Sequence, residues 1–430
     1  MRYVSISISA IGLAVFACGS YDTDQPVTDP TLANQSVSVN STAEPPSDPA
    51  NQTTKQQAPN MPEPLVDRSL ECVASQRRTL RVETFNAALA PNFAPIVAER
   101  TPEALHALSD EAEHLDVLCV QEFWQDNDFA NLASLVHAEL PHALRRPPRP
   151  STGTCTVDEL TSLGQCLAVD CAGATGVDQV LCAQSQCSSV VQNLSGGCLG
   201  CIMNNIGSDF STCVGLGGAA DPAIYGGAYD VGMLTRHRII ESDTSKELDS
   251  YFVRMAVLYA KLDVPNGGPI HVFCTHLGSS LSIIPYAGQY ASWHDEHLHQ
   301  VEQLRAYVQQ KAGNTGRVVL MGDLNTSPDG HGLVGDWADN YAALVSNDLQ
   351  DVYFNQPNVD CTWCPQNTLV DDSSAKHLYD HVLLRGFRPT AAHVTRTLDA
   401  PVNLVVSGVN VRTNLSDHYA LRAAIQTTPH

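Results

Sequence analysis

Short apolar runs, each followed by a polar residue, recur along the chain from Leu80 onward. Eight of them have the length and the branched or aromatic content of strands: residues 79–86, 115–122, 231–236, 252–262, 269–277, 318–325, 377–386 and 416–425. Apolar and polar residues mix at helical spacing over 102–114, 128–140 and about 293–312. Because strands and helices interleave, we predict an α/β (α+β) fold whose layers surround a common core.

The first 68 residues do not share this pattern. An apolar stretch follows Arg2 and ends at Ala17, which is too short for an ordinary membrane span and is typical of an export signal. The sequence VFAC resembles a bacterial lipoprotein processing site, so we predict a signal over residues 1–18 and a lipid anchor on Cys18, with an ordinary cleaved signal as the alternative.

Residues 19–68 are rich in Pro, Thr, Ser, Asn and Gln, a composition that predicts a disordered tether. We therefore expect one domain, residues 69–430, outside the cytoplasm. It would be lipid-anchored to a bacterial membrane or secreted.

Residues 151–220 contain eight of the 14 cysteines, five acidic residues and no Lys, Arg or His. We interpret this segment as a separate, helical insertion. Export favours disulfides. Two pairs that would staple a short helical hairpin are Cys166 with Cys171 and Cys182 with Cys187. A zinc site that includes Cys198 and Cys201 is the alternative.

The cysteines outside the insertion have different settings. Without Cys18 the chain has 13 cysteines, so at least one is unpaired or bonded to another molecule. Cys119 and Cys274 lie within apolar strands, and we predict that they are free, buried thiols. Cys361 and Cys364 are predicted to form a tight disulfide, because no thioredoxin-like context supports the alternative redox site.

The charge of the chain limits its partners. Lys and Arg number 24 against 46 Asp and Glu, so the formal net charge is −22. This balance disfavours generic binding to nucleic acid but leaves room for a small basic pocket that faces one phosphate. We expect a monomer.

Polar residues at the ends of predicted strands form a set. Its members are Asn86, Glu122, His276, Asp323, Asn325, Asp380, Asp417 and His418. Taken singly, an Asn or Asp at the end of a strand is usually a turn former. Asp323 and Asn325 are two positions apart in GDLN, so their side chains point to the same face of a strand.

Taken in order, the QE, GDLN and SDH sequences resemble the endonuclease/exonuclease/phosphatase superfamily, which includes DNase I-like nucleases, inositol polyphosphate 5-phosphatases and sphingomyelinases. The resemblance covers about residues 78–427, interrupted by the insertion. It implies a four-layered α/β/β/α sandwich of two mixed β-sheets, with the site at one edge of the sandwich.

The set also suits phosphoester chemistry. Mg²⁺ or another hard divalent cation prefers oxygen ligands, so Glu122 is the first predicted metal ligand, assisted by Asn86 as in the family, with Asp417 near the metal. His418 is the predicted general base, because imidazole titrates near neutral pH, and Asp380 would hold its ring.

Four further roles follow from the resemblance or from the strand pattern. Asp323 would orient the nucleophile or serve the leaving group, Asn325 would contact a phosphate, and His276 would donate to a phosphoryl oxygen. Arg254 occupies the place of an arginine near the scissile phosphate in nuclease-like members. His381 is left out, because a regular strand turns it to the face opposite Asp380.

The residue pattern favours a phospholipid substrate. CTWCPQ before the strand at 377–386, and SDHYAL at the end, resemble sphingomyelinases, whereas the tryptophan and PxWCDR-like signatures of the 5-phosphatases are missing. We therefore predict a phosphodiesterase of sphingomyelinase C type. The alternatives are an extracellular DNase I-like nuclease and a non-catalytic surface module on the same fold.

The predicted lipid activity requires a membrane-facing element. Residues 389–415 contain no aromatic residue, so we expect the aromatic hairpin of sphingomyelinases to be missing. The insertion offers two alternatives: its apolar residues form either a lipid-facing lip or the insertion's own small core. These residues are Leu199, Ile202, Met203, Ile206 and Phe210.

Overall fold

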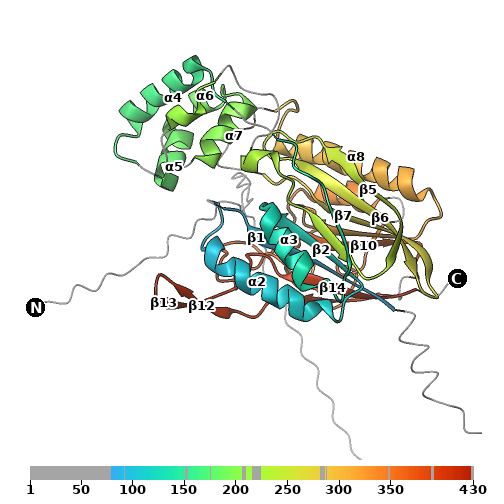
Figure 1. Ribbon diagram of the computed structural model, residues 1–430. Coiled ribbons are helices and arrows are strands. Elements are labelled where there is room, and N and C mark those ends of the chain that lie inside the picture. Colours follow the sequence, from blue (N-terminus) through green and yellow to red (C-terminus); the bar gives the residue numbers. More distant parts are fainter. Residues whose placement is uncertain are drawn as a thin grey trace, which may run out of the picture. The chain divides into compact units, whose positions relative to one another are not determined.

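The computed structural model describes residues 79–91, 93–150, 154–174, 176–205, 210–215, 224–280, 286, 288–346, 349–388 and 392–427 (Figure 1). The predicted signal, the predicted tether and Cys18 lie outside the described residues. Within these ranges, no helix combines the length and the apolar character that a membrane crossing needs.

Six strands form the first sheet: β1 (Thr79–Leu89), β2 (Val117–Phe123), β3 (His142–Arg145), β4 (Gly232–Thr235), β11 (Ala392–Thr397) and β14 (Ala420–Gln426). Their order is β11-β14-β1-β2-β4-β3. β1 pairs in parallel with β2 and antiparallel with β14, so the sheet is mixed.

The second sheet also has six strands: β5 (Arg238–Leu248), β6 (Met255–Val264), β7 (Gly268–His276), β8 (Val318–Asp323), β9 (Gln350–Asp351) and β10 (Asp380–Arg385). Their order is β5-β6-β7-β8-β10-β9, and β7 and β8 are parallel. All eight strands predicted from the sequence are present in the two sheets.

Helices cover the outer face of each sheet, which confirms the four-layered sandwich. α2 (Val97–Ala112) and α3 (Asp126–Leu135) pack on the first sheet. α8 (Trp293–Ala312) and α9 (Ala338–Val345) pack on the second. The inner faces of the two sheets share one apolar core, to which both contribute alternate residues.

Strand alternation carries the polar ends into the space between the sheets. In β8, Val319 and Met321 face the inner core, and Asp323 is the next residue with that orientation. In β10, Val382 belongs to the inner core, so Asp380 faces inward as well. His381 points to the opposite face, as the pattern predicted, and its Nδ1 lies 2.7 Å from Asp351 Oδ2.

The prediction of free thiols at Cys119 and Cys274 is wrong. Cys119 of β2 and Cys274 of β7 form a disulfide that joins the two sheets, with a Cα–Cα distance of 5.6 Å. The reason is the alternation itself. Both side chains face the inner core from opposite sheets, so two residues that are 155 positions apart in sequence meet.

The insertion is helical, as predicted. It contains α4 (Val157–Asp170), α5 (Gly176–Gln186), α6 (Ser188–Val191), α7 (Gly196–Asn204) and the short 3-10 helix η1 (Phe210–Cys213). A second 3-10 helix, η2 (Ile224–Gly227), follows before β4. Thr156 and Glu159 form a capping box at the start of α4.

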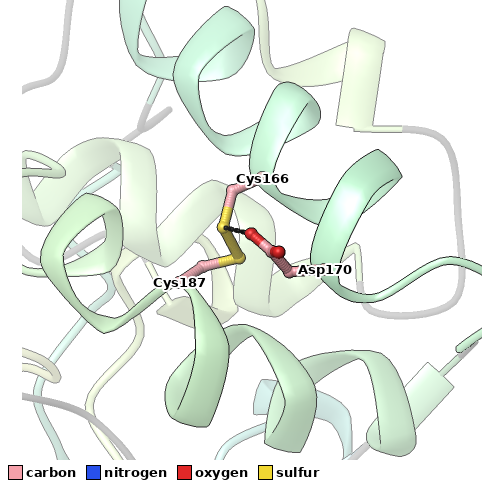
Figure 2. Close-up of side chains that lie close together, drawn as sticks. All are labelled: Cys166, Asp170 and Cys187. Atoms are coloured by element: carbon pink, nitrogen blue, oxygen red, sulfur yellow. Dashed lines mark hydrogen bonds between the residues drawn. A yellow bond between two sulfur atoms is a disulfide. The ribbon is translucent and has the colours of Figure 1, made fainter.

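The predicted cysteine pairs of the insertion are wrong. Its four disulfides are Cys155–Cys198, Cys166–Cys187, Cys171–Cys182 and Cys201–Cys213. The bonds cross between helices because residues five apart on one helix point in different directions. Figure 2 shows the Cys166–Cys187 bond beside Asp170. With both its cysteines oxidised, the alternative zinc site has no thiolate to bind a metal.

A two-stranded hairpin, β12 (Val402–Val406) and β13 (Val409–Thr413), precedes β14. The sequence pattern led us to expect that the aromatic hairpin of sphingomyelinases would be missing. A hairpin is present in that interval, but Val405 and Val409 are its exposed large apolar residues and it carries no aromatic side chain.

Candidate active site

The predicted site residues converge on one cavity of about 60 Å³ at an edge of the sandwich. From the first sheet and its ends it is lined by Glu122, Asp417 and His418, and from the second by His276, Asp323 and Asn325. Asn86 and Asp380 lie behind this lining and hold members of it by hydrogen bonds. Eight of the nine predicted site residues therefore form one hydrogen-bonded cluster or line its cavity.

His418 and Asp380 form a buried pair. The Nδ1 atom of His418 lies 2.8 Å from Asp380 Oδ2, and both residues are almost completely buried. Burial lowers the pKa of His418, but the carboxylates of Asp380 and Asp323 outweigh it and raise the pKa well above its ordinary value. Nε2, 3.6 Å from Asp323 Oδ2, is the ring nitrogen left for chemistry at the cavity.

A second acid–histidine pair lies on the other side of Asp323. His276 Nδ1 is hydrogen-bonded to Asp230, and its Nε2 lies 3.6 Å from Asp323 Oδ2. Burial lowers the pKa of His276, but the charge of Asp230 and its hydrogen bond raise it to about 9. A protonated His276 carries an N–H on both ring nitrogens, so Nε2 can donate to an anion while Nδ1 donates to Asp230.

Asp323 is the hub of the cluster. Its Oδ2 accepts a hydrogen bond of 2.8 Å from the Asn86 amide, and its Oδ1 accepts one of 2.9 Å from the Asn325 backbone N–H. The Asn325 side-chain nitrogen lies 3.0 Å from His276 Nε2. Asn325 has a φ of 45°, a left-handed conformation that is uncommon for a residue other than glycine and that aims its side chain at His276.

Glu122 reaches the cavity through a local break in strand geometry. Val120 faces the outer layer, and regular alternation would send Glu122 the same way. A φ of 59° at Glu122, next to a register shift between β1 and β2, turns its carboxylate inward. Its backbone N–H donates to Asp230 at 3.1 Å.

The predicted metal ligands fit a divalent cation in their donor chemistry. The carboxylates of Glu122 and Asp417 line the same cavity, and burial together with the charge of Asp417 raises the pKa of Glu122 to about 7. A hard cation would relieve this repulsion and find the oxygen ligands it prefers. Asn86 is oriented differently from the prediction: its amide donates to Glu122 Oε1 at 3.1 Å, while its oxygen accepts from Ala88.

Another group of possible ligand atoms lies in the same cluster. Atoms of Asp323, Asp380 and His418 lie within 4.8 Å of one another. His418 already uses Nδ1 toward Asp380 there, so we interpret this group as a candidate base with its carboxylate partners. We therefore keep Glu122 and Asp417 as the candidate metal ligands.

Arg254 does not lie where it was predicted. It is buried, its Nη1 lies 4.0 Å from Glu247 Oε2, and it does not belong to the lining of the cavity. Its neighbours Val253 and Met255 line the cavity instead. Arg254 shares the inward side of the chain with Ala256 and Leu258, and Glu247 of β5 is its ion-pair partner there.

Sequence reasoning missed three residues of the site. Asp230 directly precedes the strand predicted at 231–236, and this position beside a strand is the signal that could have identified it. Arg100 is fully buried and donates to the backbone oxygens of Ala87, Ala88 and Leu415, and so ties the segment after Asn86 to the segment before Asp417. No pattern in the sequence indicates this contact.

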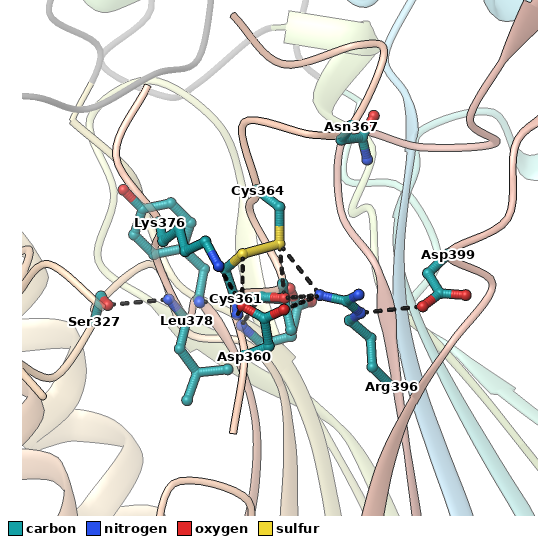
Figure 3. The surroundings of a disulfide bond; sticks show 12 residues. Ser327, Asp360, Cys361, Cys364, Asn367, Lys376, Leu378, Arg396 and Asp399 are labelled. Carbon is teal, nitrogen blue, oxygen red and sulfur yellow. Dashed lines mark hydrogen bonds and ion pairs between the residues drawn. A yellow bond between two sulfur atoms is a disulfide. The ribbon is translucent and has the colours of Figure 1, made fainter. Parts of the chain in front are cut away.

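Trp363 is the third. It lies within the CTWC sequence, lines the cavity and places its ring 5.2 Å from that of His418 at an angle of 70°. The predicted Cys361–Cys364 disulfide is confirmed and closes the loop that carries Trp363. Figure 3 shows this disulfide beside Arg396, whose Nη1 donates to Cys361 O at 3.1 Å.

The remaining wall of the cavity is largely aromatic. Phe93, Trp124, Tyr225, Phe252 and Trp293 line it together with Glu296. Glu296 belongs to the first turn of α8, the helix predicted from about residue 293. Glu296 is buried, accepts hydrogen bonds from Tyr251 N–H and Tyr286 O–H, and has its pKa raised to about 7 by burial.

The chain is similar to a known protein family over most of its length. The model described as the Endonuclease/Exonuclease/phosphatase family matches residues 84–418. No curated protein matches the chain. Among solved structures, the protein SmcL is 15% identical with a TM-score of 0.50, and covers 81% of this chain and 99% of its own. A beta toxin from Staphylococcus aureus is 16% identical with a TM-score of 0.50, over 80% of this chain and 99% of its own.

Sphingomyelinase C from Streptomyces griseocarneus is 18% identical with a TM-score of 0.49, over 81% of this chain and 99% of its own. At these identities the likeness establishes the fold alone.

Proposed function

The chain belongs to the endonuclease/exonuclease/phosphatase family, and from that premise we propose that it is a metal-dependent phosphodiesterase that acts on a phospholipid. One observation carries the hydrolytic part of the proposal. Two histidines, each paired with a buried carboxylate, point their Nε2 atoms toward Asp323 in a cavity that also contains Glu122 and Asp417.

The residues divide the reaction between them. His418, held by Asp380, removes the proton of the attacking water through Nε2. His276, whose pKa is about 9, and Asn325 donate to the phosphoryl oxygens. Asp323 lies between the two rings and orients the water or assists the departing oxygen.

Glu122 and Asp417 would hold the divalent cation, Mg²⁺ in our proposal. When bound, it supplies positive charge that polarises a phosphoryl oxygen and brings the pKa of His418 down toward that of a working base. The amide of Asn86 donates to the carboxylates of both Glu122 and Asp323 and so holds them beside each other.

Three features support a phospholipid over DNA. The net charge of −22 disfavours a polyanionic duplex. The wall of the cavity is aromatic and acidic, and such a surface suits a cationic or amphiphilic head group. The CTWCPQ and SDHYAL sequences are similar to those of sphingomyelinases, so a phosphocholine-type lipid is the substrate we propose.

The location of the protein is part of the proposal. Six disulfides among the described residues are typical of a protein from an oxidising compartment. Export and lipid attachment at Cys18 are inferred from the sequence alone.

The test uses residues 69–430 with Mg²⁺ or with EDTA, and offers sphingomyelin liposomes, a phosphoinositide and plasmid DNA. We expect phosphocholine release that requires the metal. His418→Ala should lower turnover by about 10²- to 10⁴-fold through loss of the general base. The exposed His114 provides the matched control, because His114→Ala should leave the rate unchanged.

Two results would contradict the proposal. Nicked DNA without lipid cleavage would favour the nuclease, and no hydrolysis of any substrate would favour a binding module. Wild-type rates in His418→Ala would refute the assigned base.

A further inference from the structure

The predicted lipid-facing lip is wrong for the described residues of the insertion. Ile202 and Phe210 pack in a cluster within the insertion, and Leu199 and Met203 pack against the aromatic wall of the catalytic cavity. Ile206 lies outside the described residues. A different segment, residues 360–364, contacts the proposed catalytic pair directly.

The proposed catalytic pair connects the two sheets. Asp380 begins β10 of the second sheet, whereas His418 lies two residues before β14 of the first. The 2.8 Å distance between His418 Nδ1 and Asp380 Oδ2 therefore depends on how the ends of these two strands are held relative to each other. A segment that binds both ends sets this distance.

Thr362 makes this connection. Its Oγ1 accepts the backbone N–H of Tyr379 at 3.1 Å and that of Asp380 at 3.2 Å, while its carbonyl oxygen accepts the N–H of Tyr419 at 3.0 Å. One residue thus binds the start of β10 with its side chain and the neighbour of His418 with its backbone. Thr362 has no exposed surface, so these bonds form in a low-dielectric interior, where they are strong.

Trp363 extends the same connection. It forms one β-bridge with His377, shortly before β10, and another with His418. Its N–H donates to the His377 carbonyl oxygen at 3.1 Å, and the His377 N–H donates back at 3.0 Å. The centre of its ring lies 5.2 Å from that of His418. Residues 362 and 363 therefore form a short link between the ends of the two sheets, at the position of the catalytic pair.

A covalent bond and two cations hold this link in place. Cys361 and Cys364 flank the two linking residues, and their disulfide closes the loop around them. Figure 3 shows the surroundings of this bond: Arg396 Nη1 donates to Cys361 O at 3.1 Å and lies 3.2 Å from Asp360 Oδ2. Lys376 Nζ lies 3.0 Å from Asp360 Oδ1. The loop is thus fixed on both sides of the link.

We propose that Thr362 is a positioning residue for the general base: its hydroxyl oxygen fixes the backbone of Asp380, and the Cys361–Cys364 disulfide keeps that oxygen in place. The inference rests on the proposed function for the role of His418 as a base. The placement of the His418 ring against Asp380 is a property of the fold and is measured without turnover.

The test variant is Thr362→Val, because valine has a similar shape and lacks the oxygen that accepts the two N–H groups. Thr362→Ser restores that oxygen. Thr235→Val is the matched control. Thr235 is also fully buried, and its Oγ1 accepts the N–H of His237 at 3.1 Å, but it pairs with Val117 at the start of β2 and does not line the catalytic cavity.

The first readout is kcat with Mg²⁺, on the substrate that the wild type hydrolyses fastest. We expect Thr362→Val to lower kcat by about 10- to 10²-fold with little change in KM, because the base is misplaced. Thr362→Ser should recover most of the rate, and Thr235→Val should keep it.

A double variant separates positioning from a general structural role. In an Asp380→Asn background, Thr362→Val should lower kcat by less than about twofold, because the hydroxyl acts through Asp380. A residue with a structural role alone would lower kcat by the same factor in both backgrounds.

The second readout is the nuclear magnetic resonance signal of the His418 Nδ1–H proton that is hydrogen-bonded to Asp380, in metal-free protein with isotope-labelled histidine. His418→Ala identifies this signal by its loss. It should shift or broaden in Thr362→Val and stay unchanged in Thr362→Ser and Thr235→Val. Replacing Cys361 and Cys364 with alanine frees the loop and should shift the same signal, so the test stands even if Thr362→Val does not fold. Circular dichroism checks the folding of each variant.

The outcomes separate the two proposals. An unchanged signal in Thr362→Val, or in the cysteine variant where it alone folds, overturns the positioning role whatever the enzyme hydrolyses. Equal losses of kcat in the two backgrounds also overturn it. A shifted signal in a protein whose wild type hydrolyses no phosphodiester upholds the contact between Thr362 and the pair and refutes the proposed function.

Discussion

Replacing Cys119 and Cys274 with alanine removes the disulfide that joins the two sheets. This bond closes a loop of 155 residues. Two insertion disulfides shorten that loop in the unfolded chain, because Cys155–Cys198 bypasses 43 residues and Cys201–Cys213 bypasses 12. An effective loop of about 100 residues corresponds to about 4.7 kcal/mol of unfolding free energy through chain entropy.

Urea unfolding, followed by tryptophan fluorescence and far-ultraviolet circular dichroism, measures this loss. With a denaturant dependence of about 3 kcal/mol per molar urea, the midpoint should fall by roughly 1.6 M. The matched control removes Cys171 and Cys182, whose loop spans 11 residues. Its expected cost is smaller, below about 3 kcal/mol.

Two measurements would refute this reasoning. A loss under about 1 kcal/mol in the Cys119/Cys274 variant would mean that the bond does not restrict the unfolded chain. A non-reducing peptide map in which Cys119 and Cys274 both appear as free thiols would mean that the bond is not formed. The same map is also the direct check on the four pairs within the insertion.

Three further predictions concern buried charges. Asp380→Asn should lower kcat by about 10²- to 10⁴-fold with unchanged circular dichroism, because His418 loses the carboxylate that orients its ring; steady-state kinetics near the wild-type rate would contradict this. Arg100→Met should cost roughly 3–5 kcal/mol in urea unfolding, since it leaves buried carbonyl groups without donors, and Arg100→Lys should recover part of the loss; an unchanged midpoint in Arg100→Met would rule the contact out as a stabilising one. Burial lowers the pKa of His381, but its pair with Asp351 outweighs this and raises the pKa in the folded state. The stability that the pair contributes is therefore complete below the unfolded pKa of about 6.5 and is lost as pH rises through the folded pKa. The stability difference between wild type and His381→Gln, measured by urea unfolding from pH 5.5 to 9, should therefore shrink with rising pH, and a difference that grows would reverse the assignment.

Much of the fold followed from local pattern. The strands were predictable because an apolar run in a sheet interior is short and ends in a polar residue, as at Asp323 and His276. The helix over 293–312 was predictable to its last residue, because Ser292 caps its start and Gly313 follows its end. The helix predicted at 128–140 ends earlier, at Leu135.

The site was predictable only in part. The order of polar strand ends identified eight residues that the structure brings together. It misplaced Arg254, because the ion pair of Arg254 with Glu247 joins two strands and leaves no local pattern in the sequence. It also missed Asp230, Arg100 and Trp363, whose contacts join segments far apart in the chain.

The sequence by itself determined the elements, the layered class and the residue types available for chemistry, because these depend on local periodicity and on strand ends. Only the tertiary structure decided the partners: Cys119 with Cys274, Cys166 with Cys187, and Glu122 turned inward by its left-handed backbone. Which residues pair depends on which side chains face each other across the core, and the separation of two residues in the sequence does not reveal this.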